Sequence, residues 1–594
     1  MAFGLYPLVA LPLARGGDWN GAFPFVEADE HAYAAYVRAL ADGRPRRNDP
    51  YTGRDDSPGA PLHESFFSIQ FAPPQAVALI VRVLRLDASA AFALVTLLVA
   101  LLTPLALFRL LADATGDARL SAAGALFVLC LSTAPTVYGP VQYLLGTTPI
   151  VLSYPPFLRR YVPALPFPVL FLFYLCVRRT LAASQRRAAI VSASLAALCF
   201  AALVYSYFYL WTTALAWLVG LLALWLGFRP DGWRAGAKKL AAVGALSAAA
   251  LPPYLLLVSR RDAGIDVSHQ LTATRAPDLF RTPELLALVV LLALAWGARR
   301  NFFRWRDAQT LYALSFVLLP FAVLNQHVIT GRSLQPIHYE LYAANFSALL
   351  AVVLAAGLFR RALGPARPPK IYARALAAVT LVVIVWGAAG TVRHAARMRR
   401  TYELQDRLRP VALRLAELGR AGAAGAGLDT RPVVFAASMS AADYLPTVAP
   451  QPVLWAPHMF VFPGVAPAED RERLARQLYF TGVRFDGIDE TNAASALDAR
   501  RRVYLNGLVG NTRDNPNLSL DWQPVTPAET RAALDSYAAF VAAFDRERAA
   551  RPLLSYAVAP ADGSFDFSHL DRFYERDGGE TRGDFTLYRL KLRP

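Results

Sequence analysis

Two adjacent carboxylates, Asp29 and Glu30, are the residues of this 594-residue sequence whose type and position most favour chemistry. They follow an apolar stretch at 1–14 and lie early in the polar segment 15–87. A carboxylate beside a low-dielectric surface can have its pKa raised towards working pH and act as a general base on an acceptor hydroxyl. The alternative is that both acids occupy the first turn of a short amphipathic helix in DEHAYAAYVRALADG and complement its dipole. The residue types leave both interpretations open.

Arg159 and Arg160 lie in the stretch SYPPFLRRYVPALPFP at 153–168, directly before an apolar run. The planar guanidinium fork is well shaped for the phosphate of a lipid-linked substrate. Arginines at this position also extend to the membrane interface for structural reasons, with Tyr154 and Tyr161 as interfacial aromatics. Phosphate binding and interfacial anchoring are both open for this pair.

A dense polar cluster stands between two apolar runs in NQHVITGRSLQPIHYELY at 325–342. Polar groups at membrane depth are costly unless they line a cavity or pair with one another, so the cluster predicts a hydrophilic site. The candidate substrate-binding residues there are Arg332, Gln335, His338 and Tyr339. The two histidines, His327 and His338, lack HxxxH or HExxH spacing, which argues against a zinc site.

Other polar residues favour structural roles. Asp55 and Asp56 stand before Ser-Pro-Gly and are typical of a turn. The segment 259–283, which includes Asp266 and His269, is either a solvated connector or a lid over a site. Four residues near the end of the chain show no catalytic spacing: Asp443, His458, Asp486 and Asp489.

Apolar runs of about 20 residues, the length of a membrane-spanning helix, recur through the first two-thirds of the chain. Hydrophobic residues make up 55% of the sequence and charged residues only 18%. The predicted spans are 88–110, 119–137, 163–180, 189–207, 209–228, 239–258, 283–297, 309–327, 341–359 and 374–392. Residues 1–14 are interpreted as the end of a first span. The expected fold is therefore a polytopic α-helical membrane protein with about 10–11 spans.

Lysine and arginine are distributed unevenly between alternate loops. The loops 109–119, 178–189, 229–239, 298–308 and 359–374 hold 19 of these residues in 61 positions. The loops 138–164, 259–283 and 328–341 hold 7 in 66 positions. By the positive-inside rule the first set is cytoplasmic, which places the loop 15–87 and the tail after 392 outside. The net charge of +17 follows from this loop pattern, and no basic stripe interleaved with aromatics indicates nucleic acid.

The tail is expected to form a soluble, extracytoplasmic α/β domain over 393–594, beyond a transmembrane module at 1–392. Short buried strands are predicted at VVFAAS, PVLWAP, PLLSYAVAP and FTLYRLKL, with helices between them. No GxxxxGK[ST] loop occurs, and the short cytoplasmic loops leave no room for a nucleotide-binding domain. The three cysteines, Cys130, Cys176 and Cys199, all fall in apolar runs and provide no disulfide framework.

The sequence resembles the GT-C superfamily of membrane glycosyltransferases, above all its bacterial members, and more distantly protein mannosyltransferases and arabinofuranosyltransferases. The resemblance is carried by the acidic pair Asp29–Glu30 after the first span, the polar Gln335–His338–Tyr339 group in a later external loop, and the external C-terminal domain.

The resemblance implies an inverting hexosyl- or pentosyltransferase of the bacterial inner membrane that uses a polyprenyl-phosphate sugar donor. Its acceptor would be a glycan, lipid or protein of the cell envelope, among membrane lipids and without nucleic acid. Asp29 or Glu30 would be the base, Arg159, Arg160 or Arg332 would meet the lipid phosphate, and a divalent metal ion is left open as a cofactor. The alternatives are a transporter or flippase, and a non-catalytic envelope assembly protein.

Overall fold

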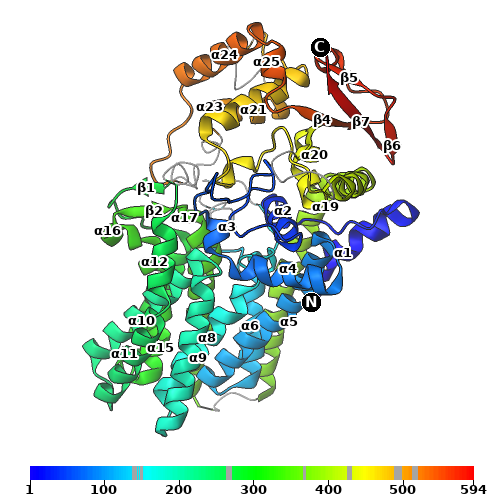
Figure 1. Ribbon diagram of the computed structural model, residues 1–594. Helices are drawn as coiled ribbons and strands as arrows, with labels where there is room; N and C mark the ends of the chain where they lie inside the picture. Colours follow the sequence, from blue (N-terminus) through cyan, green and yellow to red (C-terminus); the bar gives the residue numbers. More distant parts are fainter. Residues whose placement is uncertain are drawn as a thin grey trace.

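The computed structural model describes the chain except for residues 137, 138, 140–143, 145, 147–150, 263–270, 365–368, 424–430, 487, 489–497 and 511–518. A helical bundle forms one end of the molecule and a mixed α/β domain forms the other (Figure 1). The helices of the first polar loop lie between the two parts. Any site formed by this loop therefore has access to side chains from both.

The bundle is built from apolar helices that follow the predicted spans. They are α5 (Ala88–Thr115), α6 (Ala118–Cys130), α8 (Pro166–Ala182), α9 (Arg186–Val204), α10 (Phe208–Phe228), α11 (Trp233–Ala248), α12 (Leu251–Ser259), α14 (Thr282–Arg299), α15 (Ala308–Leu324), α18 (Asn345–Ala362) and the first half of α19 (Pro369–Ala423). Asp87 caps the N-terminus of α5 and Asp117 that of α6. These caps satisfy helix-end amides outside the apolar stretch.

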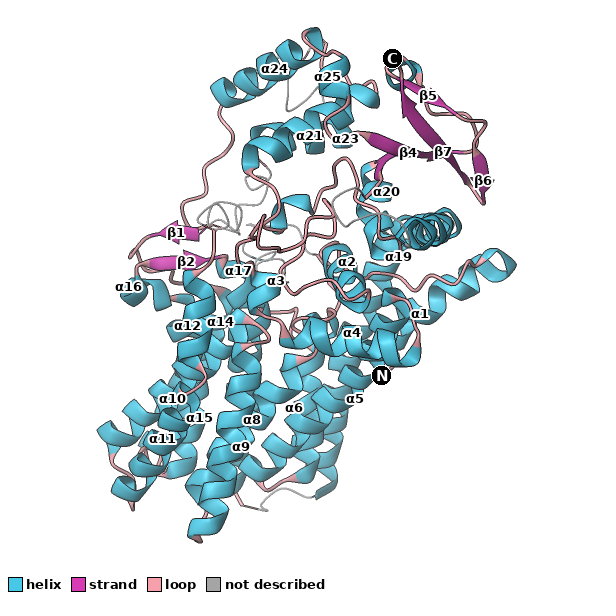
Figure 2. Ribbon diagram, viewed as in Figure 1, coloured by secondary structure: helices cyan, strands magenta, loops and turns pink. Residues whose placement is uncertain are grey.

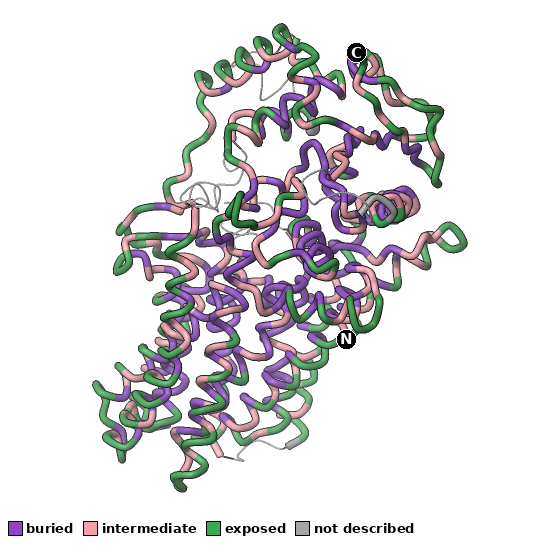
Figure 3. Tube along the Cα trace, in the orientation of Figure 1, coloured by how far each residue is buried: buried purple, intermediate pink, exposed green. Residues whose placement is uncertain are grey.

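Seven of the described helices or helix pairs are long and apolar enough to cross a membrane, and α6 and α15 are apolar but shorter. Large apolar side chains of the bundle are exposed, such as Leu101 and Leu105 on α5 and Val382 and Val385 on α19. Exposed residues recur along the outer helices of the bundle (Figure 3). A soluble protein would not leave such contiguous faces in water, whereas lipid tails solvate them. The polytopic membrane fold expected from the sequence is thus confirmed.

The second predicted span ends earlier than expected, and the apolar start of the chain is also helical. The helix expected over 119–137 ends at Cys130, and the chain turns there, with the Ala134 amide donating to the Leu131 carbonyl. Ser132 and Thr133 follow, which favour local side-chain bonds over helix. The apolar start forms α1 (Ala2–Arg15), which packs along α19 and α5. Its interpretation as the end of a span stays a prediction.

The first polar loop contains three helices: α2 (Glu30–Ala41), α3 (Phe66–Ile69) and α4 (Ala72–Leu84). The helix predicted after Asp29 is confirmed as α2, and it is buried on nearly every face. Because α2 is packed on most of its surface, it holds the residues at its N-terminus in a fixed position. Short elements on the same side of the bundle are α16 (Gln326–Thr330), α17 (Pro336–Tyr339), a π-helical turn (Glu340–Ala344) and an antiparallel ribbon of β1 (Leu271–Ala273) and β2 (Arg332–Leu334).

The predicted domain boundary at residue 392 falls inside one continuous helix. α19 runs from the bundle into the tail without a break at 392, and its later turns pack against α20 (Met439–Tyr444). Asp406 on this part is fully buried and accepts the amides of Asn20 and Ala22, which fixes the start of the first loop. The helix therefore connects the tail to both the bundle and the loop.

The tail contains a five-stranded mixed sheet (Figure 2). The strand order is β3 (Val433–Ala436), β4 (Leu554–Pro560), β7 (Phe585–Leu592) and β5 (Tyr574–Arg576), and β6 (Glu580–Arg582) also pairs with β7. β3 is parallel to β4 and the remaining pairs are antiparallel. The helices are α21 (Pro467–Phe480), α23 (Ala499–Val509), α24 (Pro527–Ala542), α25 (Arg546–Ala549) and α26 (Ser568–Asp571).

The expected α/β tail is confirmed, with one correction among its strands. PVLWAP at 452–457 makes only an isolated bridge between Val453 and Val434, so the prediction of a strand there is wrong. Leu454, Trp455 and Ala456 are nevertheless buried. An apolar run of this length cannot be told from a buried irregular segment by its pattern alone.

Candidate active site

A cavity of about 370 Å³ lies where the first loop, the bundle and the tail meet. The first loop contributes Asp29, Ala32, Tyr33, Phe66, Phe67 and Gln70, and the tail contributes Pro457, His458, Phe460 and Val461. The remaining wall comes from the bundle side: Arg159, Tyr161, Val162, Ser206, Tyr207, Phe208, Tyr209, Leu334, Gln335 and His338. A concavity rich in aromatic side chains, with a few convergent polar groups, has the character of a small-molecule site.

Asp29 presents its carboxylate to this cavity. It precedes α2 at the N-cap position but makes no side-chain capping bond, and its side chain is 52% exposed. Its Oδ2 accepts from Arg159 Nη2. The capping interpretation therefore does not describe Asp29, whose carboxylate faces a cation and the cavity instead of the amides of the helix.

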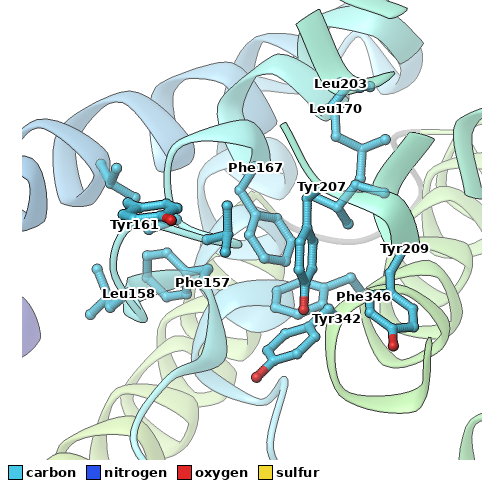
Figure 4. Close-up of a cluster of buried hydrophobic side chains, with 14 of the residues drawn as sticks. Phe157, Leu158, Tyr161, Phe167, Leu170, Leu203, Tyr207, Tyr209, Tyr342 and Phe346 are labelled. Carbon is cyan, nitrogen blue, oxygen red and sulfur yellow. The ribbon is translucent and has the colours of Figure 1, made fainter. Parts of the chain in front are cut away.

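Arg159 is buried beneath Asp29 and held by two phenols. Its guanidinium donates to the hydroxyls of Tyr33 and Tyr342, each at 2.9 Å, and lies over both rings at 5.4 and 5.6 Å from their centroids. Figure 4 shows the rings of Tyr207, Tyr209 and Tyr342 in one aromatic cluster, with their hydroxyls on the side away from Leu170 and Leu203. The cation is thus fixed in position by aromatic faces and hydroxyls.

Glu30 and Arg160 form a separate pair that does not line the cavity. Glu30 is fully buried, and its Oε2 accepts from Arg160 Nη2 at 2.6 Å and from the Val26 amide at 2.8 Å. Its Oε1 accepts from the Arg160 amide at 2.8 Å. Both carboxylate oxygens of Glu30 thus accept hydrogen bonds, and the ion pair links α2 to the segment before α8.

The polar cluster at 325–342 divides between the cavity and its surroundings. Gln335 and His338 line the cavity, and Gln335 Oε1 accepts from the Tyr209 hydroxyl at 3.1 Å. Gln335 has φ +41, a left-handed conformation that is unusual for a residue other than glycine and occurs often at functional sites. Tyr339 is buried with its hydroxyl 3.0 Å from Thr212 Oγ1, and Arg332 is exposed in β2, outside the cavity lining.

His458 and Asp443 belong to the site although the sequence offered no catalytic spacing for them. Nδ1 of His458 donates to Asp443 Oδ2 at 2.7 Å, and its Nε2 lies 3.6 Å from Asp29 Oδ1. Asp443 Oδ1 accepts from the Tyr51 hydroxyl at 3.0 Å. The tail domain therefore places a histidine beside the acid of the first loop.

The charges of these groups stabilise one another. Loss of bulk water in the cavity would raise the pKa of Asp29, but the Arg159 guanidinium and His458 overcome this and hold the pKa below its ordinary value. Burial likewise lowers the pKa of His458, but the carboxylates of Asp443 and Asp29 outweigh it and raise that pKa to about 10. At neutral pH the cavity therefore holds an ionised Asp29 between two cations.

Glu27 is a further acid at the edge of this region. Its Oε1 lies 3.9 Å from His394 Nε2, and its side chain is 39% exposed. Desolvation raises the pKa of Glu27 to about 7, although Arg159 acts in the opposite direction. Glu27 does not line the cavity. Its protonation therefore changes the charge next to the cavity wall, and not the charge of the groups that face the cavity.

The residues around Asp29 do not fit a divalent metal ion. Within the described ranges no three side chains of histidine, cysteine, aspartate or glutamate converge as a set of ligands. The two oxygens of Asp29 face Arg159 and His458, and cations in these places repel a metal.

The other candidate acids have structural partners or lie outside the described residues. Asp55 pairs with Arg44 and Arg431, and Asp56 pairs with Arg47. Asp486 is highly exposed. Asp266, His269 and Asp489 lie outside the described residues.

No protein-family model matches the chain, and the search of curated proteins finds no match. Among solved structures, the chain is similar to the apo oligosaccharyltransferase of Archaeoglobus fulgidus at 13% identity and a TM-score of 0.44, over 94% of this chain and 68% of the other. It is also similar to ArnT from Cupriavidus metallidurans bound to undecaprenyl phosphate, at 15% identity and a TM-score of 0.38, over 99% of this chain and 96% of the other.

A third similar structure is the archaeal oligosaccharyltransferase AglB from Archaeoglobus fulgidus in complex with an inhibitory peptide and a dolichol-phosphate, at 12% identity and a TM-score of 0.44, over 99% of this chain and 72% of the other. All three likenesses are at 12–15% identity, with TM-scores of 0.38–0.44. At such identities and TM-scores they say nothing of the reaction, which has to be inferred from the side chains of this chain.

Proposed function

We propose that this protein is a membrane glycosyltransferase that transfers a sugar from a polyprenyl-phosphate donor to a hydroxyl of an extracytoplasmic acceptor. The observation that carries the proposal is the half-exposed carboxylate of Asp29 beside the buried guanidinium of Arg159, in an aromatic cavity next to a lipid-facing bundle. A base and a phosphate-binding cation at one place are the two groups that this transfer needs.

The proposed reaction is a single displacement at the anomeric carbon. The acceptor oxygen forms a bond to this carbon, its proton passes to Asp29, and the bond to the phosphate oxygen breaks. The polyprenyl phosphate leaves with the electron pair, and Arg159 stabilises the negative charge that develops on it. A single displacement inverts the anomeric centre, and the proposal assigns no covalent enzyme intermediate.

The cavity suits a sugar and the head of a lipid. Aromatic faces such as Tyr33, Phe67 and Tyr209 pack against the apolar faces of a hexose or pentose, and the phenols of Tyr33 and Tyr342 already orient the phosphate-binding arginine. The proposed acceptor is a glycan, lipid or protein of the envelope. Of the two acids and three arginines predicted as site residues, the proposal assigns reaction roles to Asp29 and Arg159, a supporting role to Glu30 and Arg160, and no role to Arg332, which lies outside the cavity lining.

Sidedness is part of the proposal, because a lipid-linked donor needs no nucleotide outside the cell. The excess of lysine and arginine in alternate loops supports a cavity on the external side of the bacterial inner membrane, with the tail domain on the same side. A lipid donor diffuses within the bilayer and reaches such a cavity from the bundle.

The test is donor turnover by the purified protein in liposomes. A panel of radiolabelled polyprenyl-phosphate hexoses and pentoses is supplied with envelope extract as acceptor, and released polyprenyl phosphate is measured. We expect release for at least one donor, and none with Asp29→Asn at unchanged thermal stability. Turnover of Asp29→Asn at the wild-type rate would show that Asp29 is not the base.

The same experiment separates the alternatives. A flippase would move the labelled lipid between leaflets without cleaving it, and an assembly protein would do neither. The described ion pairs of the bundle, such as Arg178–Asp113 and Arg281–Glu340, lie at helix ends. A transport path needs ionisable groups along its length, so the placement of these pairs favours an enzyme.

A further inference from the structure

His458 reaches the cavity from the tail domain in a fixed orientation. Nδ1 of His458 donates a hydrogen bond to Oδ2 of Asp443 at 2.7 Å, and the Tyr51 hydroxyl of the first loop donates to Oδ1 of Asp443 at 3.0 Å. This arrangement directs Nε2 of His458 towards Oδ1 of Asp29, 3.6 Å away. A carboxylate behind a histidine generally fixes both its tautomer and its ring orientation.

The segment that bears His458 is anchored to the first loop. Phe462 is buried and stacks on Phe67 with ring centroids 4.5 Å apart, and its ring also lies 5.7 Å from that of Tyr51. The ring of His31 on α2 lies parallel to that of His458 at 6.5 Å. The position of His458 relative to Asp29 is therefore set by packing on both sides.

The two oxygens of Asp29 meet different cations. Arg159 holds Oδ2, and His458 faces Oδ1. An incoming phosphate competes for the guanidinium of Arg159, because a guanidinium binds phosphate with paired hydrogen bonds. When Nη2 of Arg159 donates to the phosphate in place of Asp29, Oδ2 becomes free to accept a proton, and a second contact is needed to keep the carboxylate oriented.

We propose that His458, oriented by Asp443, is a positioning residue that holds Oδ1 of Asp29 while Oδ2 takes the proton of the acceptor hydroxyl. This inference rests on the proposed function and adds the tail domain to the active site. His458 carries its proton at neutral pH between Asp29 and Asp443, so it cannot accept another one and the base remains Asp29. The charged and titratable groups that face its ring are Asp29, Asp443 and His31.

Two substitutions separate positioning from simple support. In His458→Asn, the amide nitrogen falls near the place of Nδ1, so the contact with Asp443 can persist while the reach to Asp29 is lost. In His458→Gln, the amide nitrogen falls near the place of Nε2 and restores part of that reach without the charge. The matched control is His569→Gln on α26, a histidine of the same domain that packs against Tyr479.

The experiment measures kcat and donor KM from pH 5 to 9 with the polyprenyl-phosphate sugar found by the panel. Binding of undecaprenyl phosphate is measured in parallel. We expect His458→Asn to lower kcat about 10- to 100-fold, with donor KM and undecaprenyl phosphate binding within about twofold of wild type. The kcat of His458→Gln should lie between those of wild type and His458→Asn. Loss of the cation also raises the pKa of Asp29, but from a value below its ordinary one, so we expect no new acidic limb in the kcat profile between pH 5 and 9.

The results that overturn the inference differ from those that overturn the proposed function. Wild-type kcat in His458→Asn would reduce His458 to a structural contact. A large rise in donor KM at constant kcat would make it a phosphate ligand instead. Both results would leave Asp29 as the proposed base, because Asp29→Asn would still be inactive. A fully active Asp29→Asn would instead reject Asp29 as the base, whatever the His458 variants show.

Discussion

Asp29 and Glu30 are neighbours in the chain, and their carboxylates pair with the neighbouring arginines Arg159 and Arg160. The side chain of Asp29 is half exposed in the cavity, whereas that of Glu30 is fully buried beside it. Consecutive residues at the start of a helix point about 100° apart, so one acid of the pair can face a site while the other supports the wall. The acidic pair thus combines one position that faces the cavity with one that is buried in its support.

Glu30→Gln should destabilise the protein, in contrast to Asp29→Asn. It removes the charge that compensates the buried Arg160, and breaking one partner of such a pair costs about 3–5 kcal/mol. We expect a clear fall in the melting temperature of Glu30→Gln in detergent and none for Asp29→Asn. An equally stable Glu30→Gln that lacks turnover would instead place Glu30 in the reaction.

Arg159→Lys should fold but turn over slowly. A lysine ammonium cannot donate to Tyr33, Tyr342 and a phosphate in the forked geometry of a guanidinium. Removal of a donor that stabilises the developing charge typically lowers kcat about 10²–10³-fold. Release of polyprenyl phosphate measures this change, and Arg275→Lys, at an exposed arginine that donates to backbone carbonyls, is the control. Normal kcat in Arg159→Lys would move the leaving-group role to another cation.

The bundle could be predicted from the sequence, and the acidic pair of the first loop could be singled out as a candidate, because those signals are local. Apolar runs mark helices through their length, and an acidic pair after an apolar stretch is visible in a few residues. The partners of Asp29 leave no such signal: Arg159 is 130 residues from it, and the Tyr51–Asp443 contact joins residues 392 apart. The pattern around His458 shows only a histidine between buried apolar residues, which is also typical of a domain core.

Residues 325–342 show that the sequence also fails to predict which side chains within one short segment face the cavity. Their polarity predicted a hydrophilic site, and Gln335 and His338 do line the cavity. The sequence could not separate these two from Arg332, because the left-handed turn at Gln335 decides which side chains face inward. A backbone conformation of this kind is rare for glutamine and cannot be deduced from composition.

Phe462→Ala should loosen the tail domain from the first loop. The substitution removes the ring stacked on Phe67, and truncation of a buried phenylalanine costs about 3–5 kcal/mol. We expect faster proteolysis in the segment around residues 445–465 and a fall in kcat, since His458 is then no longer held. Phe565→Ala, which removes a ring packed on Phe435 within the tail, is the comparison. Equal protease sensitivity of the two variants would show that Phe462 does not anchor the segment.

The protonation of His458 should make stability depend on pH in the alkaline range. The pKa of this histidine is about 10 in the folded protein and 6.5 ordinarily, so folding is favoured by its bound proton. This contribution is fully present below pH 6.5, decreases between pH 6.5 and 10, and is lost above pH 10. Because tyrosines and lysines also titrate there, the quantity to measure is the melting temperature of wild type minus that of His458→Gln from pH 6 to 10.5. We expect a positive difference of roughly 5 °C at pH 6 that falls to near zero at pH 10.5, since about 1 kcal/mol changes the melting temperature by a few degrees. A difference that is constant over this range would mean that His458 is neutral in the folded protein, and Asp29 would then have Arg159 as its one cationic partner among the described residues.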